Sequence, residues 1–176
     1  MTLDGLSYNA SSCYPTSKTR SCRRSWRWTS CTTAFAAKRL KRRYAQFGHA
    51  KASTGRRLTP APAFPSFLHA IIEKANAHHP RDTVFDQCII THYPPGAGIG
   101  WHTDAAGVAD CIIAVSLGGP ARLQFRENGT TNVTAEIVVL PGSLYAMTGP
   151  ARWSYQHQVV PVKTDRYSLT FRHVRT

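Results

Sequence analysis

The second half of the chain constrains the fold most, because it repeats one pattern of a short apolar segment followed by a turn. Gly and Pro, the usual turn residues, separate the segments. Eight short strands with little helix between them predict a mainly β fold with a jelly-roll or barrel core. The predicted strands are Gln87–Tyr93, Ile99–Asp104, Asp110–Ser116, Ala121–Arg126, Val133–Leu140, Ser143–Met147, Trp153–Val160 and Asp165–His173.

One helix is predicted ahead of this region, at 67–77. Apolar side chains recur there at helical spacing, Ser66 is a candidate N-cap, and His78-His79-Pro80 follows. Lys38–Phe47 fits a short basic strand or a short helix equally well. We therefore divide the chain into an atypical basic segment (1–37), a basic region with the flanking helix (38–80) and the β region (81–176).

Charge is concentrated at the start of the chain. Of its 22 Lys and Arg residues, 13 precede residue 60, where Asp4 is the only acid, and the whole chain has a formal net charge of +13. Such an arm would be attracted to phosphate backbones. A solvated tail without a partner explains the charge equally well.

Residues 8–36 are unusual in a second way. They are rich in Ser, Thr, Arg and Cys and show no sustained apolar period. One hypothesis is that this stretch is translated from a shifted reading frame, and sequencing the transcript tests it. An intact message would contradict the idea.

Composition excludes several classes of protein. The five Cys are scattered without a C-x-x-C pair, which argues against a disulfide framework and a structural zinc site. No apolar run approaches the roughly 20 residues of a membrane span, and Met1–Ala10 lacks the features of a secretory signal. We expect an intracellular, cytoplasmic monomer with no membrane and no obligate protein partner.

A pair of potential metal donors, His102 and Asp104, lies inside the β region. Positions i and i+2 of a strand point to one face, so the imidazole and the carboxylate can meet a single ion. Alone the pair is weak evidence, because two solvated polar residues are the default explanation. His157, on a later predicted strand, supplies a third donor. Two His and one carboxylate are typical of non-haem iron(II) oxygenases, and zinc hydrolysis is the competing use.

The last predicted strand carries two arginines at an even spacing. The sequence RYSLTFR at 166–172 places Arg166, Ser168, Thr170 and Arg172 on one face. Two guanidinium groups inside a β domain need an anionic partner. A dicarboxylate fits, since each carboxylate can accept an Arg fork. Together with the metal donors this pair indicates 2-oxoglutarate, whereas an exposed edge strand with solvated arginines is the simpler alternative.

Three segments taken together resemble the AlkB family of iron(II)- and 2-oxoglutarate-dependent dioxygenases. They are THYPPGAGIGWHTD at 91–104, WSYQH at 153–157 and RYSLTFR at 166–172. The resemblance extends over roughly 38–176. It implies the double-stranded β-helix fold, in agreement with the predicted strands, and makes 81–176 the dioxygenase domain.

The resemblance also implies roles for individual residues. The iron(II) ligands would be His102, Asp104 and His157, with 2-oxoglutarate as co-substrate and O2 as oxidant. Around 2-oxoglutarate, Arg166 would hold the distal carboxylate, Tyr93 would add a hydroxyl hydrogen bond, and Arg172 would lie near the keto end. The family often has Asn where this chain has Thr91 and Ser168, and both replacements keep a hydroxyl.

For the substrate, the resemblance implies oxidative removal of an alkyl group from a base flipped out of its stack. The nucleotide-contacting elements would precede the β core, which makes 38–80 a lid-like region. Rings among its cations suit a base beside phosphates, and we single out Tyr44 and Phe47 there, although such rings more often pack in a core. Trp101, next to His102, is a further candidate for the lining of the substrate cavity. Ala106 stands where the DNA-repair prototype has an acid associated with reading the damaged base.

The sequence therefore predicts a dioxygenase that demethylates or otherwise dealkylates bases in DNA or RNA. Two alternatives remain open. The same cofactors could act on a protein or small molecule, or the domain could be catalytically silent with a basic arm that binds nucleic acid. Changing His102 to Ala would abolish turnover under either enzymatic hypothesis and leave binding intact under the third.

Overall fold

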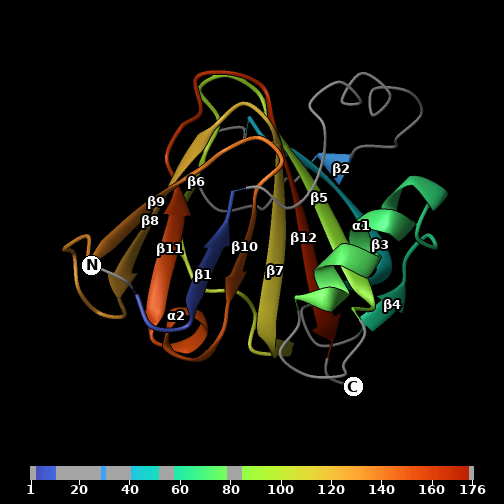
Figure 1. The fold of residues 1–176 in the computed structure, drawn as a ribbon, viewed down its shortest axis with the longest axis horizontal. Helices are drawn as coiled ribbons and strands as arrows, with labels where there is room; N and C mark the ends of the chain where they lie inside the picture. The colour runs from blue at the N-terminus through green and yellow to red at the C-terminus, as the bar shows by residue number, and fades with distance from the viewer. Residues whose placement is uncertain (1–2, 11–28, 31–40, 52–57, 79–84, 175–176) are drawn as a thin grey trace.

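The described part of the chain folds into two antiparallel β-sheets and two helices, as the computed structural model in Figure 1 shows. The structure describes residues 3–10, 29–30, 41–51, 58–78 and 85–174. Most of the predicted 1–37 segment therefore lies outside the described residues, and so does the hypothesis about its reading frame. Within the described residues, no helix is long and apolar enough to span a membrane.

The larger sheet has eight strands, ordered β1-β10-β7-β12-β5-β3-β2, with β4 paired to β3. Their bounds are β1 Leu6–Asn9, β2 Thr29–Ser30, β3 Arg43–Lys51, β4 Leu58–Pro60, β5 Gln87–Tyr93, β7 Val108–Gly118, β10 Leu144–Met147 and β12 Arg166–Val174. The smaller sheet has the order β6-β11-β8-β9. Its strands are β6 Ile99–His102, β11 Tyr155–Val159, β8 Ala121–Glu127 and β9 Ala135–Val139. The predicted mainly β fold is confirmed.

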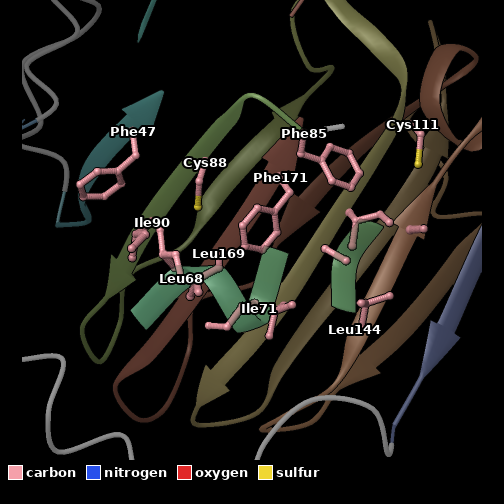
Figure 2. Packing of buried hydrophobic residues seen from close by; sticks show 14 of the residues in the cluster. Phe47, Leu68, Ile71, Phe85, Cys88, Ile90, Cys111, Leu144, Leu169 and Phe171 are labelled. Atoms are coloured by element: carbon pink, nitrogen blue, oxygen red, sulfur yellow. The ribbon is translucent and has the colours of Figure 1, made fainter. Parts of the chain in front are cut away.

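The outer face of the larger sheet is covered by α1, Ser66–Ala77. Leu68 and Ile71 of this helix belong to one buried cluster with Leu169 and Phe171 of β12 (Figure 2). The helix was predicted one residue short, with Ser66 as its N-cap. That assignment is wrong, because Pro65 is the N-cap and Ser66 is already helical, without any side-chain capping bond.

A second buried cluster fills the space between the two sheets. It combines Ile112, Tyr145 and Tyr93 of the larger sheet with Leu123 and Phe125 of the smaller one. Because side chains alternate along a strand, β5, β7 and β10 of the larger sheet each contribute to both clusters. The inner cluster surrounds the polar side chains described below.

Three elements differ from the prediction. The ambiguous segment at 38–47 contributes to a strand, β3, which pairs with β5. Leu6–Asn9 forms an edge strand against β10. The strand expected from Trp153 begins at Tyr155, because Gly149–Trp153 forms the short helix α2 with Pro150 in its first turn. Proline is well accommodated there, since that position needs no backbone N–H.

Candidate metal and co-substrate site

The three predicted metal donors meet at one end of the smaller sheet. His102 ends β6 and lies opposite His157 of β11, with ring centroids 4.2 Å apart. Asp104 was expected on the strand, but β6 ends at His102, so the carboxylate projects from the following loop. Its Oδ2 lies 3.7 Å from His157 Nε2. Two imidazoles and a carboxylate are thus neighbours, contributed by two strands and one loop.

The donor atoms are close to one another, but they do not converge on a single point where a metal ion would sit. Across the described residues, no three His, Cys, Asp or Glu side chains are arranged as a ready metal site. The donor set itself suits iron(II). His102 is also oriented for ligation, since its Nδ1 lies 2.8 Å from the carbonyl oxygen of Gly100. A carbonyl can only accept, so Nδ1 carries the proton and Nε2 keeps its lone pair.

The charge state of the donors favours a cation. Burial lowers the pKa of His157 to about 4, and His102 adds to this, while Asp104 opposes it. The His157 imidazole is therefore a neutral potential donor at physiological pH. Burial would raise the pKa of Asp104, but the charge of Arg172 and the smaller influences of His157, His102 and Arg152 outweigh it, and the pKa lies below its usual value. Asp104 is accordingly an anionic potential donor.

Arg166 is the most unusual buried side chain in the described structure. It is 0% exposed, and its Nε donates to Ser116 Oγ at 3.0 Å. Within the described residues, Nη1 and Nη2 have no hydrogen-bond partner. A buried guanidinium with two unmet donor groups is costly unless an anion completes it. Within the described residues, the side chain therefore presents a buried fork of two donors whose geometry suits a carboxylate.

Hydroxyl groups surround this fork. Tyr93 lies beside it, with its ring centroid 5.2 Å from Arg166 Cζ. Burial raises the pKa of Tyr93, with the Arg166 charge opposing the shift, so the phenol stays protonated and can donate. Thr91 and Ser116 flank Ser168 on the neighbouring strands. The predicted residues Tyr93, Thr91 and Ser168 thus share one face of the larger sheet with Arg166.

Arg172 connects the two groups of residues. Its Nη1 lies 3.5 Å from Asp104 Oδ1, and both side chains are mostly buried. The structure therefore brings the second arginine of RYSLTFR beside the metal donors and the first beside the hydroxyl groups. This is the order expected for a ligand that binds a metal with one end and Arg166 with the other.

The three candidate substrate residues lie on different faces of the two sheets. Tyr44 lies opposite Thr91 and so shares the inner face of the larger sheet. Phe47 is only 7% exposed and packs in the outer cluster beneath α1, so its assignment to the substrate site is wrong. Trp101 adjoins His102 but points to the opposite face of β6, where Arg126 Cζ lies 4.5 Å from its ring centroid. It packs away from the metal donors.

Sequence reasoning missed three residues of the site. Ser116 and Tyr145 lie on the inner face, and Tyr145 is a buried phenol whose pKa burial raises to about 12. Their hydroxyl groups on otherwise apolar strands were the available signal. Arg152 lies in α2 and contacts the loop that carries Asp104. No local pattern marks it.

Comparison with known proteins agrees with this geometry. A family model described as the 2OG-Fe(II) oxygenase superfamily matches residues 10–174. The chain belongs to this superfamily. Its members use iron(II), 2-oxoglutarate and O2. The match begins well before residue 38, where the resemblance was placed from the sequence.

Curated relatives of this oxygenase confirm the AlkB-type resemblance. Over 125 residues it is 32% identical to the alpha-ketoglutarate-dependent dioxygenase AlkB of Escherichia coli, covering 64% of this chain and 57% of that protein. Over 129 residues it is 32% identical to the mouse tRNA (carboxymethyluridine(34)-5-O)-methyltransferase ALKBH8, covering 70% of this chain and 19% of that protein. The chain thus spans less than two thirds of both relatives.

A solved structure confirms the fold. The crystal structure of a Pseudomonas putida prolyl-4-hydroxylase superposes with a TM-score of 0.62 and 18% sequence identity, covering 97% of this chain and 93% of that one. The shared architecture is the double-stranded β-helix predicted from the sequence.

Proposed function

We propose that the protein is an iron(II)- and 2-oxoglutarate-dependent dioxygenase that removes alkyl groups from nucleic-acid bases. In this proposal His102, Asp104 and His157 hold the metal, and Arg166 holds the distal carboxylate of 2-oxoglutarate. The observation that carries it is the fully buried Arg166, whose two terminal nitrogens have no partner within the described residues. A dicarboxylate bridging this fork and the metal donors satisfies both at once.

Each neighbouring group has a part in holding 2-oxoglutarate. Tyr93, protonated in its buried position, donates to the carboxylate that Arg166 binds. Thr91 and Ser168 supply hydroxyl groups on the same face. Arg172 neutralises charge near Asp104, where the keto end and its adjacent carboxylate would lie. The co-substrate is thereby fixed at both ends before the reaction begins.

When bound, iron(II) supplies the reduction of O2 by 2-oxoglutarate. One oxygen atom enters succinate, with loss of CO2, and the other enters a C–H bond of the alkyl group. The resulting N-hydroxyalkyl group breaks its C–N bond, leaving an aldehyde and the repaired base. The apolar inner cluster, including Leu123 and Phe125, excludes water from this chemistry.

Three observations support nucleic acid as the substrate. One relative is named for AlkB and another for a tRNA modification. The chain carries a net charge of +13. Exposed Lys41, together with Arg42, whose Nη1 donates to the Gly98 carbonyl at 3.5 Å, also precedes β3 beside the end of β5 that carries Tyr93. Cations therefore lie at the end of the larger sheet where 2-oxoglutarate would bind, in reach of a substrate backbone.

The test is succinate formation from 2-oxoglutarate by iron-loaded protein exposed to O2, with and without methylated single-stranded DNA or RNA. We expect succinate to rise with the methylated strand and to vanish in Asp104→Ala. The matched control is Asp110→Ala, which removes a carboxylate from β7 instead. No succinate from folded, iron-bound protein would overturn the proposal.

A second candidate keeps the cofactors and replaces the nucleic acid with a protein or small molecule. It is favoured by Phe47, which lies in the core rather than at the site, and by Ala106 at a position where an acid would read a base. Succinate formation that no methylated strand stimulates would support this candidate over the first.

A further inference from the structure

Arg152 is a buried arginine outside the predicted metal and 2-oxoglutarate sites. It lies in the short helix α2 and is 3% exposed. Its Nη1 donates to the backbone carbonyl of Asp104 at 3.3 Å, and its Nη2 donates to the carbonyl of Ala105 at 2.8 Å. The guanidinium also lies over the ring of Trp153, with Cζ 4.0 Å from the centroid. The guanidinium of Arg152 thus donates hydrogen bonds to two successive backbone carbonyls.

The segment that Arg152 contacts, residues 103–105, lies between two strands. The strand ladder of β6 ends at His102, and β7 begins at Val108. Within the described residues, no turn or ladder hydrogen bond involves the backbone of 103–105. In the described part of the chain, the backbone of the loop that carries Asp104 is therefore held by the side chain of Arg152.

The helix that carries Arg152 is itself fixed. The N–H of Thr148 donates to the carbonyl of Gly5 at 2.8 Å, and the N–H of Ala151 donates to that of Asp4 at 3.1 Å. Gly5 has a positive φ of 77°, and a Cβ there would lie 2.0 Å from the carbonyl oxygen of Thr148. The start of the chain therefore packs tightly against α2, and the guanidinium projects from a rigid support.

From these contacts we propose that Arg152 is a positioning residue, which holds the Asp104 loop so that its carboxylate meets the same metal ion as His102 and His157. This inference rests on the proposed function, because it assumes that these three side chains bind the metal. Residues that orient metal ligands typically change metal affinity by about 10- to 100-fold when they are removed.

The planar guanidinium of Arg152 is essential for positioning the Asp104 loop. Arginine can donate to two carbonyls at once, whereas lysine presents a single point donor. A merely structural arginine would affect how much protein folds, but not how tightly the folded protein binds a metal. Metal affinity, measured without turnover, therefore separates the two roles.

The experiment is titration of the metal-free protein with Co(II), followed by its visible absorption, for the full chain and three variants. Arg152→Met should bind Co(II) about 10- to 100-fold more weakly. Arg152→Lys should show a smaller loss, because it retains the charge and one donor. The matched control is Arg122→Met, which removes an exposed arginine paired with Glu136 at 2.7 Å and should leave the affinity unchanged. Circular dichroism establishes that each variant is folded at the titration temperature.

The outcomes distinguish two failures. Tight Co(II) binding by the unmodified chain, together with unchanged affinity in folded Arg152→Met, would overturn this inference and leave the proposed function standing. If Arg152→Met does not fold, Arg152→Lys decides, and unchanged affinity there overturns the inference. No Co(II) binding by the folded unmodified chain would overturn the proposed function, and the role of Arg152 with it.

Discussion

The two faces of the larger sheet differ in the kind of side chain that β12 buries on them. Toward α1, β12 contributes Leu169 and Phe171 to a cluster without charged side chains. Toward the smaller sheet, the same strand buries Arg166 and Ser168. Because neighbouring residues of one strand supply both faces, a shift of register by one residue would exchange them. The apolar outer face thus fixes the register that brings the polar residues to the site.

The difference teaches which residues stabilise the fold and which serve the site. Burial of Leu169 and Phe171 removes apolar surface from water and is favourable by itself. Burial of Arg166 is unfavourable until its terminal nitrogens find an anion. The inner-face side chains of β12 therefore do not stabilise the fold by themselves, and substitutions on the two faces of this strand should separate stability from activity.

The largest expected effect on stability comes from the outer face. Phe171→Ala removes a fully buried ring and should lower the free energy of unfolding by about 3–5 kcal/mol. Urea denaturation measures this, and Val138→Ala, at a side chain 49% exposed, is the control that should change little. The KM for 2-oxoglutarate of the remaining folded protein should stay the same. A large rise in KM would mean that the two faces are not separable.

Arg166→Met is the matching change on the inner face. Loss of the charged fork should raise the KM for 2-oxoglutarate by at least about 10-fold, since even one hydrogen bond to a charged group contributes about 1.5–3 kcal/mol. Stability without ligand should be unchanged or higher, because the buried charge is removed. Arg126→Met, on the outer face of the smaller sheet, should leave KM unchanged. A clear loss of stability in Arg166→Met would make Arg166 a structural residue.

A third prediction concerns the pH dependence of stability in the metal-free protein. The pKa of His157 is about 4 in the folded protein and 6.5 when exposed. The unfolded chain therefore takes up a proton first, and the free energy of unfolding should fall as the pH drops from about 6.5 toward 4. His157→Gln should flatten this slope in urea denaturation, whereas His69→Gln, at an exposed position on α1, should preserve it. Equal slopes in His157→Gln and the unmodified chain would contradict the assigned burial.

The sequence was sufficient to predict those elements whose apolar and polar residues alternate with a regular local period. The bounds of β5 were predicted as observed, and β12 was displaced by one residue, because alternation within each strand is a local property. The same alternation placed Arg166 and Ser168 on a shared face. The converging donors His102 and His157 could be proposed because their strands were recognised.

The features that could not be predicted from the sequence depend on contacts between segments that are distant along the chain. Phe47 was assigned to the substrate site because nothing near it indicates that α1 packs over its strand. The helix α2 has only five residues, too few to show a period. Arg152 acts on carbonyls 47 and 48 residues away, which no sequence pattern records.

The smallest expected effect lies at the contact between Ser116 and Arg166. Ser116→Ala removes the acceptor of the Arg166 Nε bond at 3.0 Å and should lower the free energy of unfolding by about 1 to 3 kcal/mol. It should also raise the KM for 2-oxoglutarate, because the fork loses the bond that orients it. Ser143→Ala is the matched control, since this buried hydroxyl on the neighbouring segment donates to the Leu140 carbonyl at 2.7 Å, whereas Arg166 Nε donates to Ser116. Ser143→Ala should lose stability alone, so an equal KM in both variants would mean that Ser116 supports the fold and not the fork.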